Sequence, residues 1–203
     1  MVTTNERSAP AVLRDLPEYK RARRAQIVRA AMNALKEQDY EQIQMRDVAE
    51  RADVALGTLY RYFSSKDQVY AAVLMEWAQP IFVVDEQDSR PAEQRIRGKV
   101  RAIIAAFDKR PGFFKVCTLL QNTSDANART IMAEFADAAQ QTLADDFSAL
   151  GPRDAADIAM MLWGIINTQL TAAILGDHPM ADANRIAEAF LDLVAPRLRA
   201  GER

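Results

Sequence analysis

Apolar positions along this chain repeat with the period of an α-helix. In the first long segment Ile27, Ala30, Ala31, Ala34 and Leu35 are spaced i, i+3, i+4, i+7 and i+8, which places them on one helical face. Signals for strands are weak, because the chain has no Asn-Gly or Asp-Gly pair and no long alternation of apolar and polar residues. Helix-favouring Ala, Leu, Arg, Gln and Glu are plentiful. The pattern therefore predicts an all-α protein.

Prolines, glycines and capping residues divide the pattern into about nine helices. Ser65 and Gln68 form a capping box at the start of the fourth helix, and Thr123 or Ser124 is expected to cap the seventh. The polar residues 1–16 are expected to be a flexible arm, 17–65 a three-helix head and 66–203 a larger helical bundle. The expected helices are 17–38, 45–52, 56–63, 65–83, 91–110, 113–121, 124–150, 152–176 and 180–199.

Composition excludes several kinds of chemistry. The 203 residues include one Cys, one His and seven Gly. A disulfide, a Cys-rich zinc site and a two-His metal site are therefore excluded. Neither phosphate-binding glycine motif, GxGxxG or GxxxxGK[ST], is present. Adjacent acids at Asp145 and Asp146 diverge on a helix. We expect a binding protein and not an enzyme, with no metal and no cofactor.

One segment is apolar enough to raise the question of a membrane. Residues 158–176 carry no charge, close to the ~20 residues that span a bilayer. Four polar residues interrupt its middle and an acid flanks each end, which disfavours insertion. The polar residues are Asn167, Thr168, Gln169 and Thr171. We expect a helix buried on several sides, no membrane association, and a cytoplasmic protein, since no apolar leader segment is visible at the N-terminus.

The second and third short helices have the spacing of a helix-turn-helix. Ala49 is small where the two helices would cross, Val54 would fill the turn from inside, and Leu59 would pack the second helix onto the first. Val48, Ala52 and Tyr62 fall at the remaining inward positions. This arrangement leaves the outer face of the second helix free to enter a DNA major groove.

Net charge differs between the head and the rest of the chain. The chain carries −2 overall, but residues 1–70 hold 12 basic and 10 acidic residues, whereas residues 71–203 hold 14 and 18. Four cations lie together at residues 20–24, and Lys66 begins the fourth helix, where the helix dipole also attracts phosphate. A mildly basic head on an acidic body is consistent with nucleic-acid binding.

The string Gly57-Thr58-Leu59-Tyr60-Arg61-Tyr62-Phe63, followed by Lys66 and preceded at a fixed distance by Arg46-Asp47-Val48-Ala49, resembles the TetR family of bacterial regulators. Within that family, residues 44–66 are most similar to actinobacterial repressors of sterol and fatty-acid catabolism. The resemblance implies a homodimer joined through its last two helices, a palindromic double-stranded DNA operator, and an inducer pocket enclosed by the fourth to eighth helices. Ligand binding would then move the fourth helix and release the operator.

DNA contacts are expected in the head, from the resemblance and from the basic cluster. The candidates are Gln44, Arg46, Leu56, Gly57, Thr58, Tyr60, Arg61, Tyr62 and Lys66, with Arg23 and Arg24 from the first helix. Two positions depart from the family pattern. Asp53 replaces the usual glycine of the turn, and Asp tolerates the left-handed conformation better than most residues. Leu56 replaces a polar residue, and could contact a thymine methyl group.

Large apolar residues of the second domain are candidates for an apolar ligand pocket. They are Trp77, Phe82, Phe113, Phe114, Cys117, Leu120, Met132, Phe135, Trp163, Ile166 and Leu170, with Asn167 as a polar member. The same residues could equally fill an ordinary core. Asn167, Gln169 and Thr171 could anchor a ligand or form hydrogen bonds at a dimer seam. The favoured hypothesis is a ligand-released repressor with a hydrophobic small-molecule effector; the alternatives are a helix-turn-helix activator and a ligand-independent DNA binder.

Overall fold

A computed structural model describes residues 17–82 and 88–201, and the arm expected at 1–16 lies outside these residues. Every regular element in the described part is helical, which confirms the all-α prediction. The elements are α2 (Glu18–Glu37), η2 (Tyr40–Gln42, a 3-10 turn), α3 (Met45–Arg51), α4 (Leu56–Tyr62), α5 (Lys66–Phe82), α6 (Ala92–Lys109), α7 (Pro111–Leu120), α8 (Ala126–Ala144), η3 (Asp145–Leu150, also 3-10), α9 (Pro152–Ile174) and α10 (Met180–Gly201).

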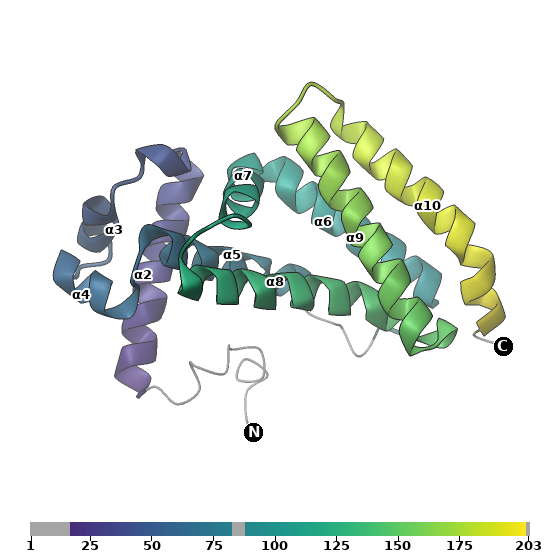
Figure 1. Cartoon of the computed structure of the whole chain (residues 1–203), viewed down its shortest axis with the longest axis horizontal. Helices are drawn as coiled ribbons and strands as arrows, with labels where there is room; N and C mark the ends of the chain where they lie inside the picture. Colours follow the sequence, from purple (N-terminus) through teal and green to yellow (C-terminus); the bar gives the residue numbers. More distant parts are fainter. Residues whose placement is uncertain (1–16, 83–87, 202–203) are drawn as a thin grey trace.

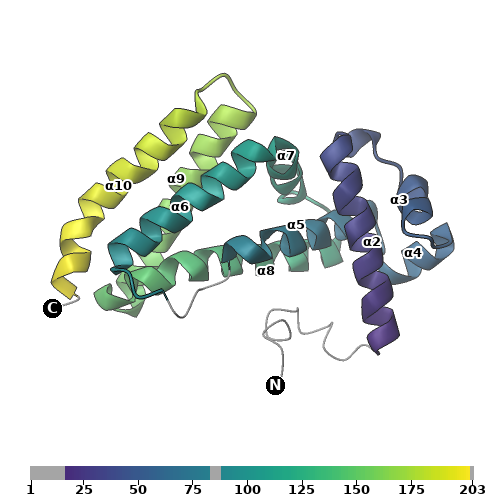
Figure 2. The same ribbon diagram turned by 180° about the vertical axis from the view of Figure 1, so that it is seen from behind.

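The helices form a small head and an elongated body (Figure 1). Helices α2, α3 and α4 cluster at one end of the long axis, and α5 runs from this head into the body beside α8. At the other end α9 and α10 lie antiparallel, with α6 packed against α10 (Figure 2). The chain thus separates a three-helix unit from a larger bundle, and α5 is common to both.

Buried side chains of three helices build the core of the head. Ile27 and Ala31 of α2 and Val48 of α3 have no exposed surface, and Leu59 is the buried residue of α4. Phe63, directly after α4, is also buried. Most inward positions predicted for a helix-turn-helix are buried, and the other two are half-buried against the core. The buried ones are Val48, Ala49, Ala52 and Leu59, and the half-buried ones are Val54 and Tyr62. Each buried Val, Ile or Leu side chain contributes on the order of 2 kcal/mol.

The largest difference from the predicted helix boundaries is at the end of α8. The helix expected to continue to Leu150 ends at Ala144, and η3 follows. In η3 the Asp146 carboxylate is 3% exposed and lies 2.7 Å from Arg95 Nε and 2.6 Å from Lys99 Nζ. A pairing between residues about 50 positions apart carries no local sequence signal.

The predicted cap of α5 is confirmed, and the predicted cap of α8 is wrong. Ser65 Oγ accepts a 3.0 Å hydrogen bond from the Gln68 amide, as predicted, although the Gln68 side chain accepts from the Ser64 amide (2.6 Å) and not from Ser65. Neither Thr123 nor Ser124 caps α8. Asp125 does, because its side chain accepts from the Ala128 amide at 2.7 Å.

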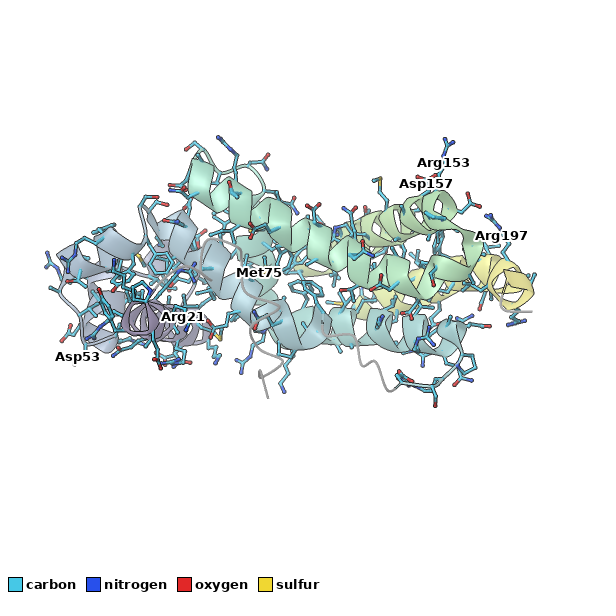
Figure 3. All side chains as sticks on the ribbon, turned by 90° about the horizontal axis from the view of Figure 1, so that it is seen from below. Arg21, Asp53, Met75, Arg153, Asp157 and Arg197 are labelled. Atoms are coloured by element: carbon cyan, nitrogen blue, oxygen red, sulfur yellow. The ribbon has the colours of Figure 1, made fainter. Side chains whose placement is uncertain are left out.

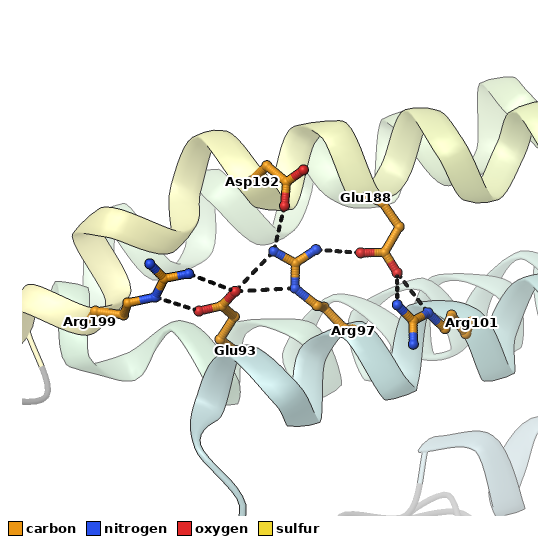
Figure 4. A network of polar contacts seen from close by, with 6 residues as sticks. All are labelled: Glu93, Arg97, Arg101, Glu188, Asp192 and Arg199. Atoms are coloured by element: carbon orange, nitrogen blue, oxygen red, sulfur yellow. Dashed lines mark hydrogen bonds and ion pairs between the residues drawn. The ribbon is translucent and has the colours of Figure 1, made fainter.

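An ion network joins α6 to α10 (Figure 4). Arg97 lies at its centre, 3.0 Å from Glu93 and 2.7 Å from Asp192, and it also binds Glu188. Arg101 and Arg199 extend it, the first to Glu188 and the second to Glu93. Because Arg97 meets three carboxylates from two helices, the network fixes the register of α10 on α6.

Helix α9 contains residues 158–174 of the uncharged segment. Among the described residues it is the one helix long and apolar enough to cross a membrane by length and composition, a test that core helices also pass. The expectation that it is buried on several sides is not met within a single chain. Ile158, Leu162 and Ile166 face the body, whereas Met160 and Met161 are 59% and 54% exposed. The outward side of α9 thus carries the exposed Met160 and Met161, and the exposed residues that follow include Thr168 and Thr171.

Candidate nucleic-acid interface

The turn between α3 and α4 depends on one backbone conformation. Asp53 adopts φ 48°, the one non-glycine residue with a positive φ in the described part of the chain. The Val54 amide donates to the Ala49 carbonyl (3.0 Å) across this turn, and the Arg23 guanidinium donates to the Asp53 carbonyl (3.3 Å). The predicted left-handed role of Asp53 is confirmed. Arg23, expected to contact DNA, binds the turn in the free protein.

Helix α4 exposes the face that is expected to enter the major groove. Tyr60 is 47% exposed and Arg61 is exposed, whereas Thr58 and Tyr62 are half-buried. The Arg61 guanidinium donates to the Thr58 hydroxyl at 3.1 Å, which holds both side chains on one side of the helix. An exposed aromatic ring beside a cation is chemistry suited to phosphates and base edges.

The first turn of α4 is small and apolar. Ala55 and Gly57 are exposed and Leu56 is half-buried against the head. A Cβ added at Gly57 would meet no atom within 4 Å, so packing inside the protein does not require glycine there. Glycine in a helix costs about 1 kcal/mol relative to Ala, and no contact within the described part of the chain accounts for that cost at Gly57.

The start of α3 contributes two exposed polar side chains. Gln44 is the N-terminal flanking residue of α3, and its side chain makes no capping bond. Arg46, two residues later, is exposed. Both lie at the helix end where amide groups point outward and attract anions.

Two predicted cations have partners inside the head. The Lys66 ammonium donates to the carbonyls of Tyr40 and Ile43 (2.8 Å for the second) and lies 4.1 Å above the Tyr40 ring. Burial lowers the pKa of Lys66. The Arg24 guanidinium stacks 4.8 Å from the centre of the Phe63 ring, and burial lowers its pKa as well. These structural roles have no local signal in the sequence, because they depend on contacts between distant segments.

Arg21 is an exposed cation of the same cluster. In the view from below, Arg21 and Asp53 lie at the head, whereas Arg153, Asp157 and Arg197 lie at the far end of the body (Figure 3). Exposed cations thus remain at the head after Arg23 and Arg24 have bound protein groups.

The candidate pocket residues come together in the body and pack against one another. Trp77 lies 4.8 Å from Phe113, and Phe82 lies 5.4 Å from Phe135, measured between ring centres. Phe107, which is not among the candidates, contacts the rings of both Trp77 and Phe114. Eight candidates are buried, namely Phe113, Phe114, Cys117, Leu120, Met132, Phe135, Ile166 and Leu170, while Trp77, Phe82, Trp163 and Asn167 are half-buried.

The polar candidates of α9 form local hydrogen bonds. Asn167 Nδ2 donates to the Trp163 carbonyl (2.9 Å), and the Thr171 hydroxyl donates to the Asn167 carbonyl (2.8 Å). Gln169 is half-buried. These intrahelical bonds favour neither a ligand nor a dimer seam. Nearby, burial raises the pKa of the Cys117 thiol to about 12, so this thiol stays protonated and unreactive.

Metal ligands do not converge in the described residues, where no three His, Cys, Asp or Glu side chains are placed to hold an ion.

Residues 27–73 match the model of the bacterial regulatory proteins of the tetR family. The chain is 35% identical over 117 residues to the HTH-type transcriptional repressor KstR of Mycobacterium tuberculosis. This match covers 55% of the present chain and 52% of that protein, so the chain spans about half the length of this curated relative.

Solved structures share the fold over most of the chain. A TetR transcriptional regulator from Rhodococcus sp. RHA1 superimposes with a TM-score of 0.73 at 22% identity, covering 87% of this chain and 97% of that one. The transcriptional regulator FadR from Bacillus subtilis, in complex with stearoyl-CoA, gives 0.63 at 20% identity, covering 84% and 96%. At these identities the likeness establishes the architecture, and it agrees with the match over residues 27–73.

Proposed function

The chain carries the N-terminal domain of the tetR family of bacterial regulatory proteins on the helical fold of TetR regulators, and from this premise we propose that it is a DNA-binding repressor of transcription. The resemblance first noted in residues 44–66 is thereby confirmed at the level of the family. The observation that carries the proposal is the outer face of α4, where Tyr60 and Arg61 are exposed on a helix whose inner face is buried. A major groove admits such a helix.

Selection of bound sequences from random double-stranded DNA tests this proposal. The wild-type chain should enrich a defined sequence, and Tyr60→Ala and Arg46→Ala should weaken binding at least tenfold in a gel-shift assay. Arg153→Ala, which removes a fully solvated cation at the far end of the body, is the matched control and should bind like wild type. If Tyr60→Ala and Arg46→Ala bind DNA as tightly as the control Arg153→Ala, the assignment of the head as the DNA-binding surface is contradicted.

We infer that the protein acts as a homodimer on a palindromic operator. Support comes from the exposed Met160 and Met161 of α9 together with Leu193 of α10, which is 78% exposed. A two-fold dimer places two recognition helices at half-sites about 34–36 Å apart, or somewhat more. Met161→Asp with Leu193→Asp should give a monomer by sedimentation and abolish operator binding, whereas a dimeric double variant would refute this interface.

We propose that an apolar small molecule releases the operator. Support comes from the aromatic cluster of the body and from the similar fold of a regulator solved with stearoyl-CoA. Stearoyl-CoA and a steroid are suitable probes: either should quench Trp77 or Trp163 fluorescence and release selected DNA. A reporter assay in cells distinguishes repression from activation, and DNA binding that no probe changes would favour the ligand-independent alternative. Cell fractionation should place the protein in the cytoplasm.

A further inference from the structure

Asp67, in the first turn of α5, joins the head to a distant segment of the body. The Tyr40 hydroxyl donates to Asp67 Oδ1 at 2.6 Å, and the Thr123 hydroxyl donates to Asp67 Oδ2. Tyr40 belongs to η2 in the head, while Thr123 lies in the loop between α7 and α8. One carboxylate therefore binds a hydroxyl from each side of the boundary between head and body.

A second set of bonds runs parallel to the first. The Ser64 hydroxyl donates to Asp125 Oδ2 (3.1 Å), and Asn127 Nδ2 donates to Ser64 Oγ (3.1 Å). Asp125 also caps α8, so the first turn of α8 is bonded directly to the junction between α4 and α5. We call Thr123, Asp125 and Asn127 the α7–α8 corner.

The bonds from this corner suit a positioning role. Thr123 is only 8% exposed, and Asp67 is half-buried. Burial and the hydrogen bond to Asp67 raise the pKa of Tyr40, so its hydroxyl remains a donor. The bond to the Ala128 amide lowers the pKa of Asp125, so this carboxylate remains ionised. Hydrogen bonds to an ionised carboxylate are short and strong compared with neutral ones.

The bonds of the corner reach the segments that adjoin α3 and α4. Ser64 is two residues beyond Tyr62, the last residue of α4, and Tyr40 lies in the turn that leads to α3. Helix α8 packs along α5 and against α9, which connects the corner to the rest of the body. A change in the position of the N-terminus of α8 would therefore act on both helices of the helix-turn-helix.

We propose that the α7–α8 corner sets the orientation of the head on the body, with Asp67, Thr123 and Tyr40 as positioning residues for DNA binding. The inference rests on the proposed function. In a dimer, the orientation of each head fixes the separation of the two recognition helices, and hence the preferred spacing between half-sites. Loosening the corner should leave contacts within each half-site intact while relaxing the requirement for one spacing.

Thr123→Val tests this inference, since it removes the hydroxyl and keeps the shape. Thr123→Ser restores the hydroxyl, and Thr118→Val is the matched control, because the Thr118 hydroxyl bonds only to the Phe114 carbonyl of its own helix. Gel shifts would compare the selected operator with operators lengthened or shortened by one base pair. Should Thr123→Val fold poorly, Tyr40→Phe breaks the contact from the head side. Hydrogen exchange of α4 amides reports on the free protein.

Wild type, Thr123→Ser and Thr118→Val should discriminate between spacings by at least tenfold, and Thr123→Val and Tyr40→Phe by less than about threefold. Amides of α4 should exchange faster in these two variants, while those of α10 keep their wild-type rates. Undiminished discrimination by Thr123→Val and Tyr40→Phe would overturn the positioning role and leave the proposed function intact. Failure of the wild type to bind any DNA would instead overturn the proposed function, and this inference with it.

Discussion

The substitution Lys66→Met tests two roles of Lys66, one in the stability of the head and one in DNA binding. In the structure the Lys66 ammonium donates to the carbonyls of Tyr40 and Ile43 and lies over the Tyr40 ring. An ammonium has three N–H donors, so one remains for a DNA phosphate beside the N-terminus of α5. Methionine keeps most of the apolar stem and removes only the charged donors. The variant should therefore lose stability and DNA affinity for different, separable reasons.

The loss of stability can be worked from these contacts. Hydrogen bonds from charged groups contribute about 1.5–3 kcal/mol each. Lys66 is only partly buried, so water can replace part of each bond, and about 1 kcal/mol for each is appropriate. The ammonium–ring contact adds about 0.5 kcal/mol at a partly exposed site. The free energy of unfolding of Lys66→Met should therefore be about 2.5 kcal/mol lower than that of wild type, as measured by urea titration.

The contribution to DNA binding appears in the salt dependence. Each phosphate neutralised contributes about −0.9 to the slope of log K against log salt concentration. If Lys66 contacts one phosphate in each half-site, Lys66→Met should make this slope less negative by about 0.9 for each half-site. Lys36→Met is the control, since the Lys36 ammonium bonds only Asn33 on an exposed helix face. A weaker affinity with an unchanged slope would refute the phosphate contact, and unchanged stability would refute the structural role.

Three further predictions follow from individual residues. Gly57→Ala should raise stability by up to about 1 kcal/mol in thermal unfolding, because nothing lies within 4 Å of the new methyl group, while gel shifts show weaker operator binding; unchanged DNA affinity would contradict close approach at Gly57. Asp146→Asn should cost about 3 kcal/mol by urea unfolding, because it leaves Arg95 and Lys99 without their buried carboxylate, and a loss under 1 kcal/mol would contradict this. Burial raises the pKa of Glu76, so the folded state disfavours its ionised form and stability declines as the pH rises through the interval between the ordinary and the raised pKa. The free energy of unfolding of Glu76→Gln relative to wild type should therefore increase as the pH rises from about 4 to 7. A stability difference between the two proteins that does not change with pH would rule this out.

Local patterns in the sequence predicted much of this molecule. Helical spacing identifies the elements, and the Ser65 cap follows from nearby residues. The left-handed conformation of Asp53 was expected from the resemblance, because Asp53 stands where the family has the glycine of the turn. These features depend on atoms a few positions apart. The inward set Ala49, Val54 and Leu59 could be predicted for the same reason, since a helix-turn-helix brings them together over a short stretch of chain.

Features that require distant segments to meet could not be predicted. Nothing in residues 60–70 indicates that Lys66 binds the Tyr40 carbonyl or that Asp67 binds Thr123, because these bonds join segments that are 26 and 56 positions apart in the chain. The early end of α8 has the same origin, since Asp146 is held by α6. For the aromatic residues, sequence indicates burial but not whether their rings pack together or surround a ligand.

Cys117 makes the folded protein a convenient subject for site-specific labelling. It is the one cysteine of the chain, it is buried, and its thiol has a pKa of about 12. Maleimides and nitroxide reagents react with thiolates, so they should leave Cys117 unmodified near neutral pH. A cysteine introduced at an exposed position of α4 or α8 would then be the sole reactive thiol. Pairs of such labels could report the distance between the two recognition helices without first removing the native cysteine.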